Sequence, residues 1–182
     1  MTNGYLKRCA ENNAGRLTSK DLAVRRLQGW LPAPTLAAHT MNAQQIALVQ
    51  KTFDKIDPIA QQVGDLFYTR LFEIDPSLRA LFKGDMKKQA LMLMTVIGLA
   101  VRGLDRPEAT AVAVRSLGER HYHYGVSPAD YNTFGAALLW ALEQVLDEAF
   151  TPEVKQAWIE AYDWLASAMK QANGPEGQRA ER

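Results

Sequence analysis

The chain contains, at residues 117–126, the stretch Leu117-Gly118-Glu119-Arg120-His121-Tyr122-His123-Tyr124-Gly125-Val126, which holds two of its three histidines. By the i, i+3, i+4 rule, His121 shares a helical face with Val114, Leu117 and Tyr124. Its imidazole is therefore expected to point inward from the last turn of a helix. A histidine in such a position is more often a hydrogen-bonded core residue than a metal ligand. The pattern alone leaves both interpretations open.

From Met41 onward, the spacing of apolar residues predicts one helix after another and no strands. The first helix carries Ile46, Val49, Phe53 and Ile56 on one face, and Pro58 starts the second. A short third helix runs from Asp75-Pro76 to Phe82, and Asp85 caps a long apolar helix that ends near Leu104. Three further helices are expected to start at Asp105-Arg106-Pro107-Glu108, Ser127-Pro128 and Thr151-Pro152, the last two about 22 residues long each. The fold class is all-α, with six to seven helices in one domain.

The composition excludes several classes of protein. A formal net charge of +1 argues against a general nucleic-acid binder. The one cysteine, Cys9, excludes an internal disulfide and a cysteine-based metal cluster. No apolar run reaches the roughly 18–20 residues that a transmembrane helix needs, and the N-terminus lacks the pattern of a secretory signal. We therefore expect a cytoplasmic protein.

Residues 1–40 differ from the rest of the chain and are expected to be an N-terminal extension. They hold six Lys and Arg against two Asp and Glu, a net charge of +4, which leaves −3 for residues 41–182. Apolar residues from Leu17 to Leu31 could form a basic amphipathic helix that touches a membrane or a partner. The alternatives are a flexible tail, or a start codon assigned upstream of the real first residue, Met41. The main domain is expected to span residues 41–173, followed by a flexible tail at 174–182.

Two polar residues fall among apolar ones in the predicted helices. Gln89 lies one turn before Leu93 on the fourth helix, and Tyr68 lies beside Phe67 and Leu71 on the second. A buried amide or phenol needs a hydrogen-bond partner, so each residue either lies at the rim in water or points at something bound inside.

Over residues 42–172 the chain resembles the globin family, in particular bacterial single-domain globins related to the haem domain of flavohaemoglobins. The resemblance rests on Phe67-Tyr68-Thr69-Arg70-Leu71-Phe72, on Asp75-Pro76 with Phe82 six residues after the proline, and on Leu117-Gly118-Glu119-Arg120-His121 with Tyr124-Gly125-Val126. Asp130-Tyr131 and the Ala157-Trp158 and Ala161-Tyr162 pairs add to it. The resemblance implies a globin fold, with helices A, B, C, E, F, G and H around a haem pocket and no D helix.

The resemblance also implies a role for each site residue, with haem b as the cofactor. His121 corresponds to the axial ligand of the iron, while His123 would point about 200° around the helix, toward solvent. The remaining haem contacts implied are Phe82 packed on the porphyrin, Leu93, Gln89 and Tyr68 on the distal side, Val126 and Tyr131 on the proximal side, and Arg120 near a propionate.

The expected function is reversible binding of O2, NO and CO. Bound O2 carries partial negative charge, so donors from Tyr68 and Gln89 would stabilise it and slow its release. No histidine lies between His39 and His121, so a second histidine ligand is not expected. The family also implies an NO dioxygenase that depends on an external reductase, or a protein that supplies or buffers O2. The glutamate that flavohaemoglobins place late in their last helix has no match here, since about Asn173 takes its position.

Two alternatives belong to other classes of function. In the first, the chain is a globin-type haem sensor or docking protein that uses residues 1–40. In the second, it is a haem-free interaction protein in which His121 is a core residue. We expect a monomer or a weak homodimer in either case.

Overall fold

The computed structural model describes residues 41–171, and the predicted extension and C-terminal tail lie outside them. The described elements, in chain order, are α3 (Ala43–Ile56), η1 (Asp57–Ile59), α4 (Ala60–Ile74), η2 (Pro76–Leu81), α5 (Met86–Arg102), α6 (Pro107–His123), α7 (Asp130–Leu146), η3 (Asp147–Ala149) and α8 (Pro152–Gln171). The described residues contain no strand, which confirms the predicted all-α fold. None of their helices is long and apolar enough to cross a bilayer.

α5 and α6 begin where the sequence predicted, and α3 begins at a cap that the sequence analysis did not name. Asn42 opens α3 with a capping box, in which its side chain accepts a hydrogen bond from Gln45 N–H at 2.9 Å and Gln45 reciprocates at 2.8 Å. Asp85 caps α5 by accepting from Lys87 N–H at 2.9 Å, as predicted. Pro107 starts α6 at a first-turn position, where a missing N–H costs nothing.

The short helix predicted between Asp75-Pro76 and Phe82 is present as a 3-10 helix, Pro76–Leu81. Three details of the predicted helices were wrong: the start of the second helix, and the start and the length of α7. Pro58 lies in a separate 3-10 turn before α4.

α7 begins at Asp130 instead of Ser127-Pro128. The residues before it form a turn with i to i−3 bonds, from Asp130 N–H to Ser127 O at 3.1 Å and from Asn132 N–H to Ala129 O at 3.2 Å. The Asp130 carboxylate still accepts a hydrogen bond from Ser127 N–H at 2.7 Å, as the third residue of a capping box does. α7 ends after 17 residues at Asp147, whose φ of 46° breaks the helical backbone.

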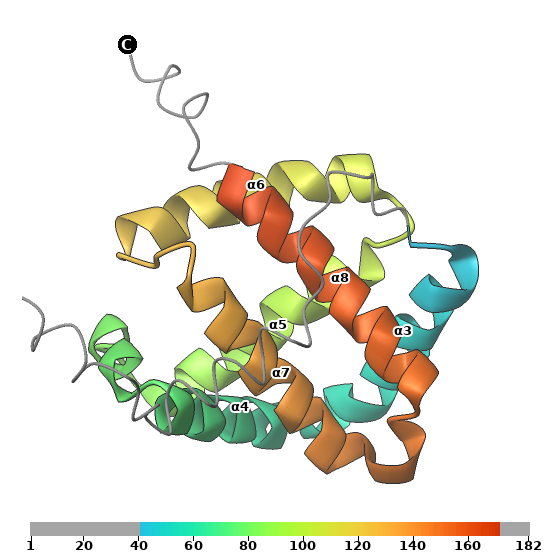
Figure 1. Cartoon of the computed structure of the whole chain (residues 1–182), viewed down its shortest axis with the longest axis horizontal. Coiled ribbons are helices and arrows are strands. Elements are labelled where there is room, and N and C mark those ends of the chain that lie inside the picture. Colours follow the sequence, from blue (N-terminus) through green and yellow to red (C-terminus); the bar gives the residue numbers. More distant parts are fainter. Residues whose placement is uncertain (1–40, 172–182) are drawn as a thin grey trace, which may run out of the picture. The chain divides into compact units, whose positions relative to one another are not determined.

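The helices pack in two groups around a shared core. α4 packs against α5 and α7, while α8 packs against α6 and α3 (Figure 1). Phe53, Leu71, Met94 and Leu142 are among the fully buried side chains of this core. Trp158 Nε1 of α8 donates to Thr52 Oγ1 of α3 at 2.9 Å, so the buried Thr52 hydroxyl and the Trp158 indole satisfy each other.

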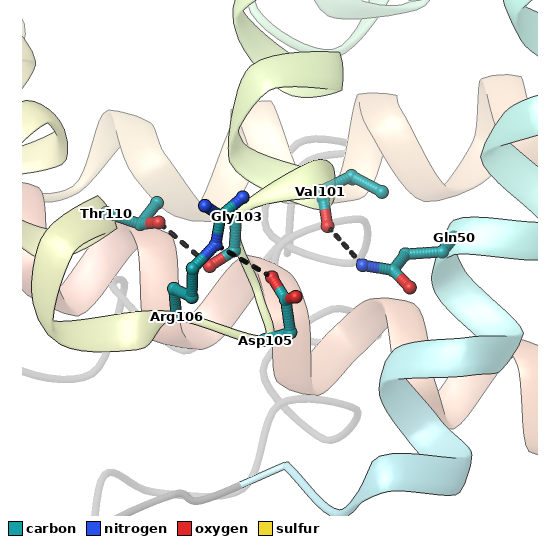
Figure 2. A network of polar contacts seen from close by, with 6 residues as sticks. All are labelled: Gln50, Val101, Gly103, Asp105, Arg106 and Thr110. Atoms are coloured by element: carbon teal, nitrogen blue, oxygen red, sulfur yellow. Dashed lines mark hydrogen bonds and ion pairs between the residues drawn. The ribbon is translucent and has the colours of Figure 1, made fainter.

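The link between α5 and α6 is held by polar contacts, shown in Figure 2. Thr110 Oγ1 donates to Gly103 O at 2.8 Å, and Gln50 Nε2 of α3 donates to Val101 O at 3.2 Å. Both bonds reach carbonyl groups at or just beyond the C-terminal end of α5, which also accept backbone hydrogen bonds from Leu104 N–H and Arg106 N–H of the following turn. The connection therefore fixes where α6, the helix that carries His121, begins.

Candidate functional site

His121 lies in the last turn of α6, and its ring is held by one hydrogen bond. Its Nδ1 is 2.9 Å from the backbone oxygen of Leu117. A carbonyl oxygen can only accept, so Nδ1 carries the hydrogen and Nε2 is left with a free lone pair. Histidines that bind metals usually donate their other N–H to a carbonyl or carboxylate in this way. His121 is therefore oriented as a metal ligand would be.

The surroundings of His121 favour the neutral imidazole. Burial lowers its pKa below the usual value, the bond to Leu117 opposes that shift, and the nearby Arg120 charge adds to it. Neutral imidazole is the form that binds a metal ion. His123 is exposed, on the side of α6 expected from the sequence. The inward orientation predicted for Tyr124 is wrong, because this side chain is 67% exposed beyond the last turn of α6.

Tyr131, near the start of α7, lies beside the His121 ring. Their ring centroids are 6.4 Å apart and the planes differ by 28°. The Tyr131 side chain is buried at 3% exposure, and its hydroxyl has no hydrogen-bond partner among the described residues. Burying a hydroxyl without a hydrogen-bond partner lowers the stability of the fold, unless a bound group that is not part of the protein forms a hydrogen bond with it. This orphaned hydroxyl beside a correctly oriented imidazole fits a site that holds a prosthetic group.

Val126 joins Tyr131 in a cluster beneath the last turn of α6. Both are buried, together with Val114 of α6 and Ala166 and Met169 of α8. Leu81, Leu117, Phe134, Tyr162, Trp164 and Leu165 pack against this cluster as partly buried residues. The structure therefore brings Val126, Tyr131 and the helix of His121 together.

Tyr68 and Phe82 meet in a second, aromatic group. Their ring centroids are 5.1 Å apart at an interplanar angle of 74°, and Phe72 lies 5.7 Å from Phe82. Burial raises the pKa of Tyr68 to about 12, so its hydroxyl stays protonated and can donate a hydrogen bond. The predicted tyrosine and the predicted haem-packing phenylalanine are therefore neighbours.

Gln89 and Leu93 are both half-buried and lie on one side of α5. Their position relative to Tyr68 is set by the crossing of α4 and α5. A Cβ atom on Gly64, one turn before Tyr68, would lie only 2.7 Å from the Cβ of Ala90, the neighbour of Gln89. The two backbones can approach this closely only because residue 64 is a glycine.

Arg120 is exposed, and no hydrogen bond or ion pair described in the structure joins its side chain to the other predicted site residues. Its predicted role near a propionate therefore stays a prediction. Two surface hollows, of about 480 Å³ beside α4 and about 390 Å³ between α3 and α8, are lined by none of the predicted site residues.

Phe134 of α7 is a site residue that the sequence analysis missed. Its ring is 6.5 Å from Phe82 and 6.1 Å from Phe67, and it also packs against the cluster that contains Tyr131 and Val126. It therefore connects the aromatic group of Tyr68 with the surroundings of His121. The signal was available, because Phe134 is three residues after Tyr131 and shares its helical face.

Comparisons with known proteins agree with this geometry. The Globin family model matches residues 65–169 of the chain. A flavohemoprotein of Xylella fastidiosa is 32% identical over 128 residues, which is 69% of this chain and 32% of that protein, so the chain spans about a third of its length. An anaerobic nitrite reductase HBII of Casuarina glauca is 30% identical over 151 residues, which is 75% of this chain and 94% of that protein.

A solved structure also matches. It is the structure of an engineered carbene transferase, and its name describes the protein as an inferred nitric oxide dioxygenase from Rhodothermus marinus. The match has a TM-score of 0.69 at 26% identity and covers 79% of this chain and all of the other.

Proposed function

The chain belongs to the globin family, and from this membership we propose that it holds haem b on His121 and reversibly binds O2, NO and CO. The observation that carries the proposal is the hydrogen bond from His121 Nδ1 to Leu117 O, at 2.9 Å. It leaves Nε2 as the free ligand atom, on a ring whose lowered pKa favours the neutral form. Haem supplies an iron centre that binds diatomic gases and changes redox state.

The residues around His121 would hold the cofactor on both sides. Phe82 offers an aromatic ring to the porphyrin, and Leu93 an apolar side chain on the distal side. Tyr131 and Val126 would line the proximal side, where the Tyr131 hydroxyl has no hydrogen-bond partner among the described residues. Arg120, exposed beside His121, would pair with a propionate.

Tyr68 and Gln89 would hold the gas ligand. The Tyr68 hydroxyl stays protonated far above neutral pH, so it would donate a hydrogen bond to O2 held in the pocket. Gln89 would add an amide donor from the adjacent helix. Two donors of this kind favour O2 and slow its release.

A second protein ligand to the iron is not expected. His123, the other histidine in residues 41–171, is exposed and faces away from His121. The distal position would therefore be open to a gas or to water.

We further propose NO dioxygenase chemistry with an external electron donor as the physiological role. Relatives named flavohemoprotein and a structural neighbour named as an inferred nitric oxide dioxygenase support this choice. High O2 affinity suits the reaction, because a protein that keeps its O2 can meet NO with O2 already bound. It suits O2 delivery poorly.

The test is an absorption spectrum of the purified ferrous protein with and without O2, followed by stopped-flow measurement of O2 release. A Soret band and slow release are expected. No Soret band after reconstitution with haem would refute the proposal, and fast release would refute the roles of Tyr68 and Gln89.

A further inference from the structure

A concentrated patch of positive charge lies beside the aromatic group of the site. Arg79, Lys83, Lys87 and Lys88 are exposed, and they are four of the thirteen Lys and Arg in residues 41–171. The same stretch, residues 79–88, holds one carboxylate, Asp85, whose side chain is engaged as the cap of α5. Elsewhere in residues 41–171, fifteen carboxylates outnumber nine cations. The cationic patch is therefore a local exception on an acidic domain.

The three lysines of the cationic patch are unpaired. Lys83, Lys87 and Lys88 make no ion pair with another residue of the described chain. Arg79 is held in place, because its guanidinium donates to Phe82 O at 3.3 Å and lies 5.2 Å from the centre of the Phe72 ring. Three flexible charges with no internal partner are available to a partner molecule.

An exposed apolar strip continues from the lysines along α5. Leu91 is 48% exposed, Met92 62% and Leu99 66%, which is unusual for side chains of this size. Their spacing puts them on the same face of α5 as Lys88. We call Lys88, Leu91, Met92 and Leu99 the α5 face. An apolar strip next to a charged rim is the composition of a protein–protein interface.

The cationic patch is in contact with the site through aromatic rings. Phe72, under the Arg79 guanidinium, is 5.7 Å from Phe82, and Phe82 is 5.1 Å from Tyr68. Lys83 directly follows Phe82 in the chain. A molecule docked on the patch would therefore lie one or two side chains from the residues proposed to hold haem.

We propose that the cationic patch and the α5 face together form the docking surface of a small acidic protein that carries a reduced flavin. The positive charge selects an acidic partner, and the name flavohemoprotein of the relatives supports a flavin as its redox group. The proposal rests on the proposed haem function. The docked donor is oxidised by one electron, and the haem iron is reduced from ferric to ferrous. Opposite charges would steer the encounter and the apolar strip would hold the complex.

An anionic membrane fits these observations less well. A bilayer surface is far wider than the cationic patch, so the acidic remainder of the domain would also approach the lipid and be repelled. A small acidic protein can cover the patch and the α5 face alone.

The experiment uses flavodoxin as an acidic probe with the full-length, haem-loaded protein. Binding of oxidised flavodoxin is followed by NMR, and reduction of the ferric haem by reduced flavodoxin is followed in a stopped-flow instrument at several salt concentrations. In the double variant Lys87→Glu/Lys88→Glu, we expect affinity and second-order rate to fall roughly tenfold or more, with a flatter salt dependence. The matched control Lys51→Glu/Lys55→Glu, an exposed pair on α3, should change both by less than about twofold.

A second pair of variants tests the apolar strip. Met92→Ser should weaken flavodoxin binding, whereas Val112→Ser, at an equally exposed apolar residue of α6, should leave it unchanged. The proposal would be overturned if Lys87→Glu/Lys88→Glu and Lys51→Glu/Lys55→Glu lowered affinity and rate equally. It would also be overturned if the rate at which flavodoxin reduces the wild-type haem did not change with salt concentration. Binding to phosphatidylglycerol vesicles that depends on Lys87 and Lys88, while flavodoxin fails to bind, would overturn it as well.

Failure of this inference can be told apart from failure of the proposed function. The NMR binding measurement involves no electron transfer, and the Soret band and O2 release of every variant are recorded separately. A normal haem spectrum without flavodoxin binding would refute only the proposed docking surface. A missing Soret band in the wild-type protein would refute the proposed function.

Discussion

The backbone carbonyl of His121 accepts a hydrogen bond of 3.0 Å from the N–H of Val126. A second bond, from Gly125 N–H to Tyr122 O at 2.9 Å, completes a Schellman motif with Gly125 in the left-handed region at φ 87°. The turn that ends α6 thus fixes both the backbone of His121 and the entry of Val126 into the buried cluster. The residue proposed to bind the iron belongs to the same rigid unit as its helix cap.

Gly125→Ala should therefore destabilise the protein by about 1–2 kcal/mol, because a Cβ atom is strained in the left-handed region. The free energy of unfolding from urea titration measures it. Gly84→Ala is the control, since φ is not positive there and the added Cβ would lie at an ordinary 3.7 Å from Gln89 Nε2. We expect the control to change stability by less than about 0.5 kcal/mol. Equal losses would show that the cap is not strained by alanine.

His121→Ala should abolish stable haem binding, because no other described histidine can take its place. His123→Ala, two residues away and exposed, should retain it. The Soret absorbance after gel filtration of the reconstituted proteins distinguishes the two. Haem retained by the His121 variant would overturn the assignment of the ligand.

Tyr68→Phe should raise the dissociation rate of O2 roughly tenfold or more, the loss expected for a hydrogen bond of about 1.5 kcal/mol to a charged acceptor. Stopped-flow replacement of O2 by CO gives the rate. Tyr122→Phe removes an exposed hydroxyl on α6 and should leave the rate unchanged. An unchanged rate in Tyr68→Phe would mean that this tyrosine only packs.

Tyr131→Phe and Tyr162→Phe should have opposite effects on the haem-free protein. The Tyr131 hydroxyl is buried without a partner, so its removal should be neutral or stabilising. Tyr162 donates a hydrogen bond of 2.5 Å to Tyr131 O, so its loss should cost about 1 kcal/mol. Urea unfolding compares the two variants. A clear loss of stability in Tyr131→Phe would show that its hydroxyl already has a partner.

Alkaline pH should destabilise the wild-type protein more than Tyr68→Phe. Burial raises the pKa of Tyr68 from 10.0 to about 12, so above pH 10 the unfolded chain releases a proton that the folded chain keeps. Stability from this group is present below pH 10 and is lost as pH rises toward 12. Urea midpoints at pH 8, 10 and 11 would show it. Parallel pH profiles for the two proteins would contradict a buried Tyr68.

The sequence predicted the order and type of the elements because the helix signals are local. The Asp85 cap and the Pro107 start depend on residues a turn apart, and both are confirmed. The start of α7 was predicted a few residues early, since the backbone after Ser127 first makes i to i−3 bonds, which the capping residues alone do not reveal. The 3-10 form of residues 76–81 likewise follows from packing that a short apolar pattern does not specify.

In the candidate site, too, only the features that depend on local sequence could be predicted. Helical spacing and the family motif favoured His121 over His123 as the proposed ligand. They could not reveal that the His121 ring is held by Leu117 O or that the Tyr131 hydroxyl lacks a partner, because both depend on side-chain orientation. The position of Phe134 on the face of Tyr131 could have been predicted, but its contact with Phe82, a residue 52 positions earlier in the chain, could not.

Gly118, one turn before His121, lies against the backbone of α8, where a Cβ atom would come within 2.4 Å of Met169 O. A helix in backbone contact with its neighbour cannot slide along it without a collision. We therefore expect the helix that carries His121 to keep one position whether or not a gas is bound. Such a protein has a single affinity, and its saturation follows one hyperbola with the concentration of free gas. The gas occupancy of this pocket would then report only the local gas concentration, with no second position of α6 to transmit a signal.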